Sequence, residues 1–126
     1  MSKEGILKDK IVLAVDDGQD TIDTIEEVLD MCIVDKAYNY KEASQFLLSY
    51  TYDVVVLDIM GVNGFELLKI ATGRGFPTVI LTAHAVTQDV QKKSLRLGAI
   101  SLLPKEKMHE LVELLEDVIS GRGKSW

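Results

Sequence analysis

Short apolar runs alternate with amphipathic stretches five times along the chain. Each run is four or five residues long and rich in branched side chains, which is typical of strands buried on both faces of a sheet. The stretches between the runs carry apolar residues at helical spacing. The pattern therefore predicts five strand–helix units, with strands at Ile11–Val15, Ile33–Ala37, Val54–Leu57, Thr78–Leu81 and Ile100–Leu103.

Two of the predicted helices carry additional signals. Asn39, followed three residues later by Glu42, is the pattern of a helix N-cap with its acidic partner. The last helix has a stripe at i, i+3, i+4 and i+7 spacing, with its glutamates expected outside that stripe. The stripe residues are Met108, Leu111, Val112, Leu115, Val118 and Ile119, and the glutamates are Glu110, Glu113 and Glu116.

Strand–helix alternation with short loops predicts right-handed crossovers and a parallel sheet covered by helices on both faces. For five units we expect a single α/β domain with a flavodoxin-like (βα)5 doubly wound sheet and the strand order 2-1-3-4-5. The domain takes in residues 1–126, with its core at about 10–120. Residues 121–126 are expected to form a tail or the start of a linker.

The composition narrows the classes of partner and the compartment. A net charge of −6 disfavours direct binding of nucleic acid, which needs a clustered basic surface, and suits a bound divalent cation. No run approaches the roughly 20 apolar residues that cross a bilayer, so we expect no membrane insertion. The polar N-terminus does not have the pattern of a signal peptide, and Cys32 has no partner for an internal disulfide. A cytoplasmic location is the expectation.

Reactive side chains follow four of the five predicted strands. Because the carboxyl ends of parallel strands meet at one edge of a sheet, these side chains should converge there. They are Asp16 and Asp17 after the first strand, Asp58 after the third, Thr82 after the fourth and Lys105 shortly after the fifth.

Their chemistry suits phosphoryl transfer. Clustered carboxylates raise one another's pKa unless a cation neutralises them, and Mg²⁺ prefers oxygen ligands. A carboxylate can attack phosphorus and form an aspartyl-phosphate. Transfer then depends on positioning and on charge stabilisation, which Lys105 and the metal would supply, with a hydrogen bond from Thr82.

In order and spacing, these residues resemble the CheY-like receiver domains of two-component response regulators, from Lys10 to Gly121. The matching pieces are Val-Asp-Asp at 15–17, Val-Val-Val-Leu-Asp at 54–58, Asn-Gly-Phe-Glu-Leu-Leu at 63–68, Ile-Leu-Thr-Ala at 80–83, Leu-Gly-Ala at 97–99 and Lys105.

The resemblance implies that Asp58 accepts a phosphoryl group from a sensor histidine kinase or a phosphotransfer protein. It implies that Mg²⁺ is held by Asp16, Asp17, Asp58 and the backbone carbonyl of Met60, and that Thr82 and Lys105 contact the phosphoryl group. The domain would then regulate a downstream protein, as a monomer or as a weak phosphorylation-dependent dimer. It would not be an enzyme beyond catalysing its own phosphorylation and dephosphorylation.

Three departures from the family pattern affect these expectations. The loop Asp58-Ile-Met-Gly-Val-Asn-Gly is about two residues shorter than usual, which leaves the position of the Met60 carbonyl open. Glu106 replaces the usual proline, so the Lys105–Glu106 bond should be trans. Leu102 replaces the switch aromatic of the fifth strand. We therefore expect phosphorylation to remodel residues 82–97 more than that strand, with an output face along the fourth helix, fifth strand and fifth helix.

Other functions fit the sequence less well. A degenerate receiver that binds proteins without being phosphorylated is the main alternative, and the short loop favours it. A flavin-binding carrier would need a phosphate loop where Asp16 and Asp17 stand, and an aspartate phosphatase would need a cap domain. His84 could border the phosphorylation site, whereas His109 should be solvated and Trp126 could touch a partner.

Overall fold

The computed structural model describes residues 4–83 and 86–121 of the chain. Its strands form one parallel sheet in the order β2-β1-β3-β4-β5, which confirms the predicted single-domain flavodoxin-like fold. The predicted positions are right, with small differences at four ends. β3 and β4 each run one residue further than their apolar runs, and β5 both starts and ends one residue later. The strands are β1 Ile11–Val15, β2 Ile33–Ala37, β3 Val54–Asp58, β4 Thr78–Thr82 and β5 Ser101–Pro104.

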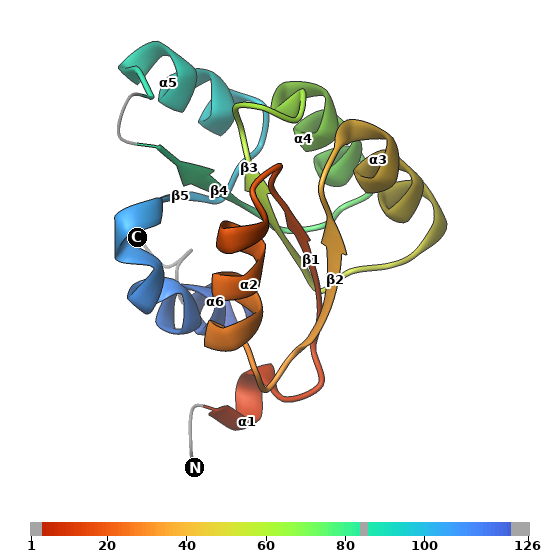
Figure 1. Ribbon diagram of the computed structural model, residues 1–126, viewed down its shortest axis with the longest axis vertical. Coiled ribbons are helices and arrows are strands. Elements are labelled where there is room, and N and C mark those ends of the chain that lie inside the picture. Colours follow the sequence, from red (N-terminus) through yellow and green to blue (C-terminus); the bar gives the residue numbers. More distant parts are fainter. Residues whose placement is uncertain (1–3, 84–85, 122–126) are drawn as a thin grey trace.

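Helices cover both faces of the sheet, so the domain has three layers (Figure 1). Alternate strand residues supply the two cores: Leu13 and Leu57 pack with α3 and α4, whereas Val12 and Val56 pack with α2 and α6. Helix α5 lies on the same face as α3 and α4. The main helices are α2 Gln19–Val28, α3 Tyr40–Ser49, α4 Gly64–Gly73, α5 Gln88–Arg96 and α6 Leu111–Ser120.

The predicted start of the second main helix is confirmed. Oδ1 of Asn39 accepts a hydrogen bond from the backbone N–H of Glu42 at 2.9 Å. Oε1 of Glu42 in turn accepts one from the backbone N–H of Tyr38 at 2.8 Å. These bonds satisfy two backbone donors that the helix itself cannot pair, so they define where α3 begins.

The last helical segment differs from the prediction in two ways. Its first residues form a 3₁₀ helix, η1, at Lys105–Glu110, before α6 begins. The expectation that Glu116 lies outside the buried surface is wrong, because this residue is only 2% exposed. A short helix that the pattern did not predict, α1 Glu4–Leu7, also packs against α6. More of α6 is therefore covered than its apolar stripe indicates.

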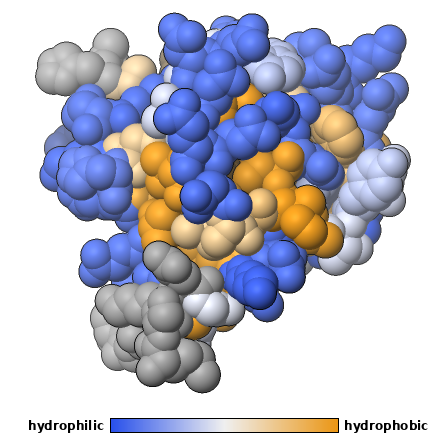
Figure 2. Space-filling view, turned by 60° about the horizontal axis from the view of Figure 1, so that its bottom comes forward, coloured by the Kyte–Doolittle hydropathy of each residue, from blue (hydrophilic) through white to orange (hydrophobic). Residues whose placement is uncertain are grey.

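The edge of the sheet where the strands begin lies away from the predicted site. Figure 2 faces that side and shows apolar side chains between hydrophilic ones. Ile11 and Ile33, the first residues of β1 and β2, are 37% and 51% exposed. Within the described part of the chain, no helix combines the length and the apolar character needed to cross a membrane.

Candidate functional site

The sheet brings the predicted site residues to its carboxyl edge. Asp16 and Asp17 follow the last residue of β1, Asp58 ends β3 and Thr82 ends β4. Lys105 is the first residue of η1, directly after β5. The parallel register aligns these ends, pairing Asp58 with Leu81 and Thr82 with Pro104. The convergence expected from strand order is therefore present.

Three carboxylates form the centre of the site. One oxygen from each of Asp16, Asp17 and Asp58 lies within 4.8 Å of the others. Asp16 and Asp58 are 1% and 4% exposed, whereas Asp17 is exposed. Carboxylates this close repel one another and offer an oxygen-rich set of ligands, which is the donor chemistry that Mg²⁺ prefers. The donor set fits such an ion.

Lys105 neutralises part of this charge. Its Nζ lies 2.8 Å from Oδ2 of Asp16 and 3.7 Å from Oδ2 of Asp58. Burial alone would lower the pKa of Lys105, but the hydrogen bond with Asp16 and the charges of Asp58, Asp16 and Asp17 outweigh burial and raise it. Lys105 is therefore a fixed cation at the site. Oδ1 of Asp16 also accepts a hydrogen bond from the backbone N–H of Gly18 at 2.8 Å, so both of its oxygens are held.

Asp58 is in a different electrostatic position. Burial, followed by the charge of Asp16, raises the pKa of Asp58 from 3.8 to about 6. The Lys105 charge and a hydrogen bond from the backbone N–H of Met60, at 3.3 Å, partly offset that rise. The central carboxylate is thus destabilised in its charged form, which favours a cation or a covalent change that removes its charge.

Thr82 is 7% exposed at the end of β4. Within residues 4–83 and 86–121, its hydroxyl has no hydrogen-bond partner. Thr82 ends β4 and Asp58 ends the neighbouring strand β3. The sequence predicts a hydroxyl at this position, beside the phosphoryl group. That role remains a prediction.

The short loop after β3 has an unusual backbone. Gly61 and Asn63 both have positive φ, at 87° and 56°. Gly64 begins α4 with its Cα against the backbone of Ile59, where a Cβ has no room. Met60 is half exposed, and whether its carbonyl contacts a metal stays a prediction. The apolar pattern does not reveal this path; the only sequence signal is the spacing of Gly61, Asn63 and Gly64.

The other departures from the family pattern have clear positions. The described peptide bonds include no cis bond, so the Lys105–Glu106 bond is trans as predicted. Leu102 is partly buried and packs against the core beneath α3 and α4. His109 is exposed as predicted, with Nε2 3.7 Å from Oε2 of Glu110. His84 and Trp126 lie outside the described residues.

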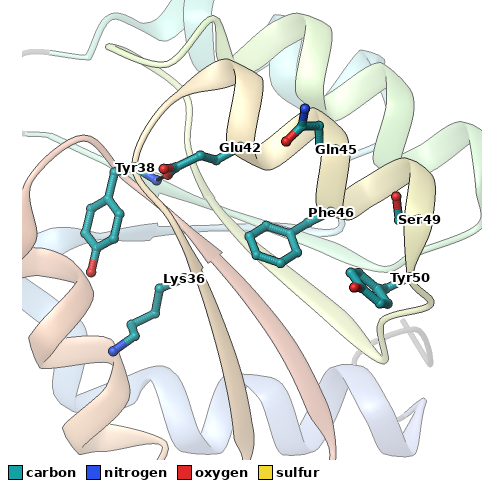
Figure 3. Close-up of a pocket in the computed structure, with 7 residues that line it drawn as sticks. All are labelled: Lys36, Tyr38, Glu42, Gln45, Phe46, Ser49 and Tyr50. Carbon is teal, nitrogen blue, oxygen red and sulfur yellow. Dashed lines mark hydrogen bonds between the residues drawn. The ribbon is translucent and has the colours of Figure 1, made fainter.

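A groove of about 560 Å³ lies elsewhere, between β2 and α3 (Figure 3). The predicted site residues are not among those that line it. It is bordered by aromatic rings, of which Phe46 and Tyr50 lie 6.0 Å apart between centroids. The groove is therefore separate from the acidic site; its lining residues are Lys36, Tyr38, Glu42, Gln45, Phe46, Ser49 and Tyr50.

Comparison with protein families identifies the domain. Residues 12–116 match the model of the response regulator receiver domain. The chain belongs to this family. The receiver domain is a component of two-component response regulators, and the acidic cluster, Thr82 and Lys105 lie at the carboxyl edge of its sheet.

Relatives and solved structures agree with this assignment. The chain is 36% identical over 77 residues to the probable transcriptional regulatory protein SilR of Salmonella typhimurium, covering 58% of this chain and 33% of that protein. It is 34% identical over 93 residues to a probable transcriptional regulator of Porphyra purpurea, covering 68% and 44%. The chain thus spans less than half the length of these relatives.

Structural similarity extends over nearly the whole chain. A CheY-like receiver domain protein from Methanospirillum hungatei has a TM-score of 0.82 at 21% identity, covering 94% of this chain and all (100%) of that one. A response regulator from Thermotoga maritima has a TM-score of 0.78 at 24% identity, covering 89% and 98%. At these identities the similarity establishes the shared fold.

Proposed function

We propose that this receiver accepts a phosphoryl group on Asp58 and thereby controls a protein partner. The observation that carries the proposal is the position of Asp58. Its nearly buried carboxylate ends the central strand, between two further carboxylates and the Lys105 ammonium. Burial, followed by the charge of Asp16, raises the pKa of Asp58 from 3.8 to about 6. The site therefore favours removing the charge of Asp58.

The proposed reaction is transfer of a phosphoryl group to this carboxylate. An oxygen of Asp58 attacks the phosphorus of the donor, a new O–P bond forms and the bond from phosphorus to the leaving group breaks. Lys105, with Nζ 3.7 Å from Oδ2 of Asp58, pairs with the charge on the transferred group. The Thr82 hydroxyl donates a hydrogen bond to one of its oxygens. Later attack by water on phosphorus releases phosphate and restores the carboxylate.

Mg²⁺ is the proposed cofactor. Asp16, Asp17, Asp58 and the Met60 carbonyl would hold it. When bound, the ion neutralises the carboxylates and the negative charge of the transferred group. The support from this chain is the donor set itself, since three carboxylate oxygens within 4.8 Å are costly to keep together without a cation.

The partners follow from the family and remain proposals for this chain. A histidine kinase or phosphotransfer protein would supply the phosphoryl group, and a downstream protein would read the phosphorylated state. Two relatives are named as probable transcriptional regulators, but this chain matches less than half of each. We propose a cytoplasmic location, a monomer or weak phosphorylation-dependent dimer, and no direct nucleic-acid contact by this domain. Its catalysis would be limited to its own phosphorylation and dephosphorylation.

The test is incubation with acetyl phosphate, with Mg²⁺ or with excess EDTA. We expect phosphorylation with Mg²⁺ and a loss of most of it in EDTA. A protein that is never labelled, under either condition or by any histidine phosphodonor, would instead be a degenerate receiver that binds partners unphosphorylated.

A further inference from the structure

Asp17 differs from the other two carboxylates in how it is held. Asp16 is fixed through both oxygens by Lys105 and Gly18, and Asp58 accepts a hydrogen bond from Met60. Asp17 makes no side-chain hydrogen bond or ion pair with any residue in 4–83 or 86–121. An exposed, unpaired side chain is free to rotate. Its position near the other carboxylates therefore depends on what it packs against.

The packing partner is Gly61, in the short loop after β3. A Cβ built on Gly61 would lie 2.8 Å from Oδ2 and 3.2 Å from Cγ of Asp17. A real Cβ does not approach an oxygen that closely, so one of the two groups must move. Because Asp17 is exposed and unpaired, its carboxylate would yield at less cost than the loop backbone.

We propose that Gly61 is a positioning residue for the metal site. Its bare Cα lets the shortened loop pass directly beside Asp17, and this contact keeps the carboxylate turned toward Asp16 and Asp58. A side chain at position 61 would push Asp17 out of the cluster and leave two carboxylates for the cation. The inference rests on the proposed Mg²⁺ site, but it concerns a residue outside the set of ligands.

The effect of a side chain at position 61 on Asp17 can be separated from the backbone strain that any substitution of a glycine with positive φ causes. Its φ of 87° makes any substitution strained, whatever the space around it. Gly75 has a φ of 80°, and a Cβ there would meet nothing within 4 Å. Gly61→Ala and Gly75→Ala therefore carry the same kind of backbone cost, and only the first displaces Asp17.

The experiment is a titration of the metal-free protein with MgCl₂, followed by backbone amide NMR shifts, for the wild type and both variants. We expect Gly61→Ala to weaken Mg²⁺ binding by about 10–100-fold, because replacing a residue that supports a metal ligand commonly lowers the affinity by that factor. Gly75→Ala should bind as the wild type does. In an Asp17→Ala background, Gly61→Ala should weaken binding no further, because both changes act through one carboxylate.

Each result has a definite meaning. Equal Mg²⁺ affinity of wild type and Gly61→Ala would overturn the inference while leaving the proposed function intact. Additive losses in the double variant would also overturn it, since Gly61 would then act on something other than Asp17. A wild type that does not bind Mg²⁺ would defeat the metal site and the inference together. If Gly61→Ala does not fold, Gly61→Asn takes its place, because asparagine tolerates positive φ while still adding a Cβ.

Discussion

Nζ of Lys105 lies 2.8 Å from Oδ2 of Asp16, a carboxylate that is only 1% exposed. The lysine is thus a structural counter-ion as well as a proposed contact of the phosphoryl group. Replacing it would leave buried negative charge without compensation, which is costly in a site that already holds three carboxylates.

Lys105→Met should therefore lower stability at pH 8 as well as phosphorylation. We expect a loss of about 1–3 kcal/mol in the free energy of unfolding of the metal-free protein, measured by urea denaturation. Lys107→Met is the matched control, since Lys107 is an exposed lysine in the same 3₁₀ helix. Similar stability of the two variants would mean that the contact with Asp16 contributes little.

Asp58→Asn should stabilise the metal-free protein in a pH-dependent way. The pKa of Asp58 is raised from 3.8 to about 6 by burial and by Asp16, so the native state disfavours the charged carboxylate. The stability associated with this group is complete below pH 3.8 and is lost as pH rises through about 6. Asparagine carries no such charge.

We expect Asp58→Asn to raise the free energy of unfolding by roughly 1–3 kcal/mol at pH 8 and to change it little near pH 4. Urea denaturation at both pH values measures this difference. Asp23→Asn, at an exposed position of α2, is the control and should show no such pH dependence. A gain at pH 8 that is no larger than at pH 4 would contradict the electrostatic account.

The start of α4 should not tolerate a side chain. A Cβ on Gly64 would collide with the backbone of Ile59, whereas a Cβ on Gly73, at the other end of the same helix, meets nothing within 4 Å. Thermal and urea unfolding should show Gly64→Ala destabilised by roughly 1–3 kcal/mol. Gly73→Ala should be neutral or stabilised by up to about 1 kcal/mol. Equal changes in stability for Gly64→Ala and Gly73→Ala would mean that the short loop moves easily to accommodate the added Cβ.

Phosphorylation should be transmitted mainly through α5. Ser94 is the only residue of α5 that is buried, so the core holds this helix weakly. Its Lys93 also contacts α4, with Nζ 4.3 Å from the centroid of the Phe65 ring. Leu102 has no aromatic ring to rotate, so a weakly anchored α5 is the element that a change at Thr82 can displace most easily.

Hydrogen exchange with and without beryllofluoride tests this route. We expect changes in residues 86–97 that exceed those in β5, and no change in Asp58→Asn. Changes centred on residues 101–104 with α5 unaffected would refute it.

Much of the site follows from the sequence because strand ends in a parallel sheet share an edge. Asp16, Asp58 and Thr82 were placed correctly for that reason. The burial of Glu116 was not predictable, because helical periodicity gives the apolar face of α6 and not which further positions of the helix the fold covers. The contact of Gly61 with Asp17 was missed as well, since it joins segments far apart in the chain through the path of one loop.

The most direct test that Asp58 is the phosphoacceptor is the intact mass of the protein after incubation with Mg²⁺ and acetyl phosphate. We expect the addition of one phosphoryl group to the wild type and none to Asp58→Asn. Asp53→Asn, at a position before β3, should be labelled as the wild type is. Phosphorylation that persists in Asp58→Asn would contradict the assignment of the phosphoacceptor.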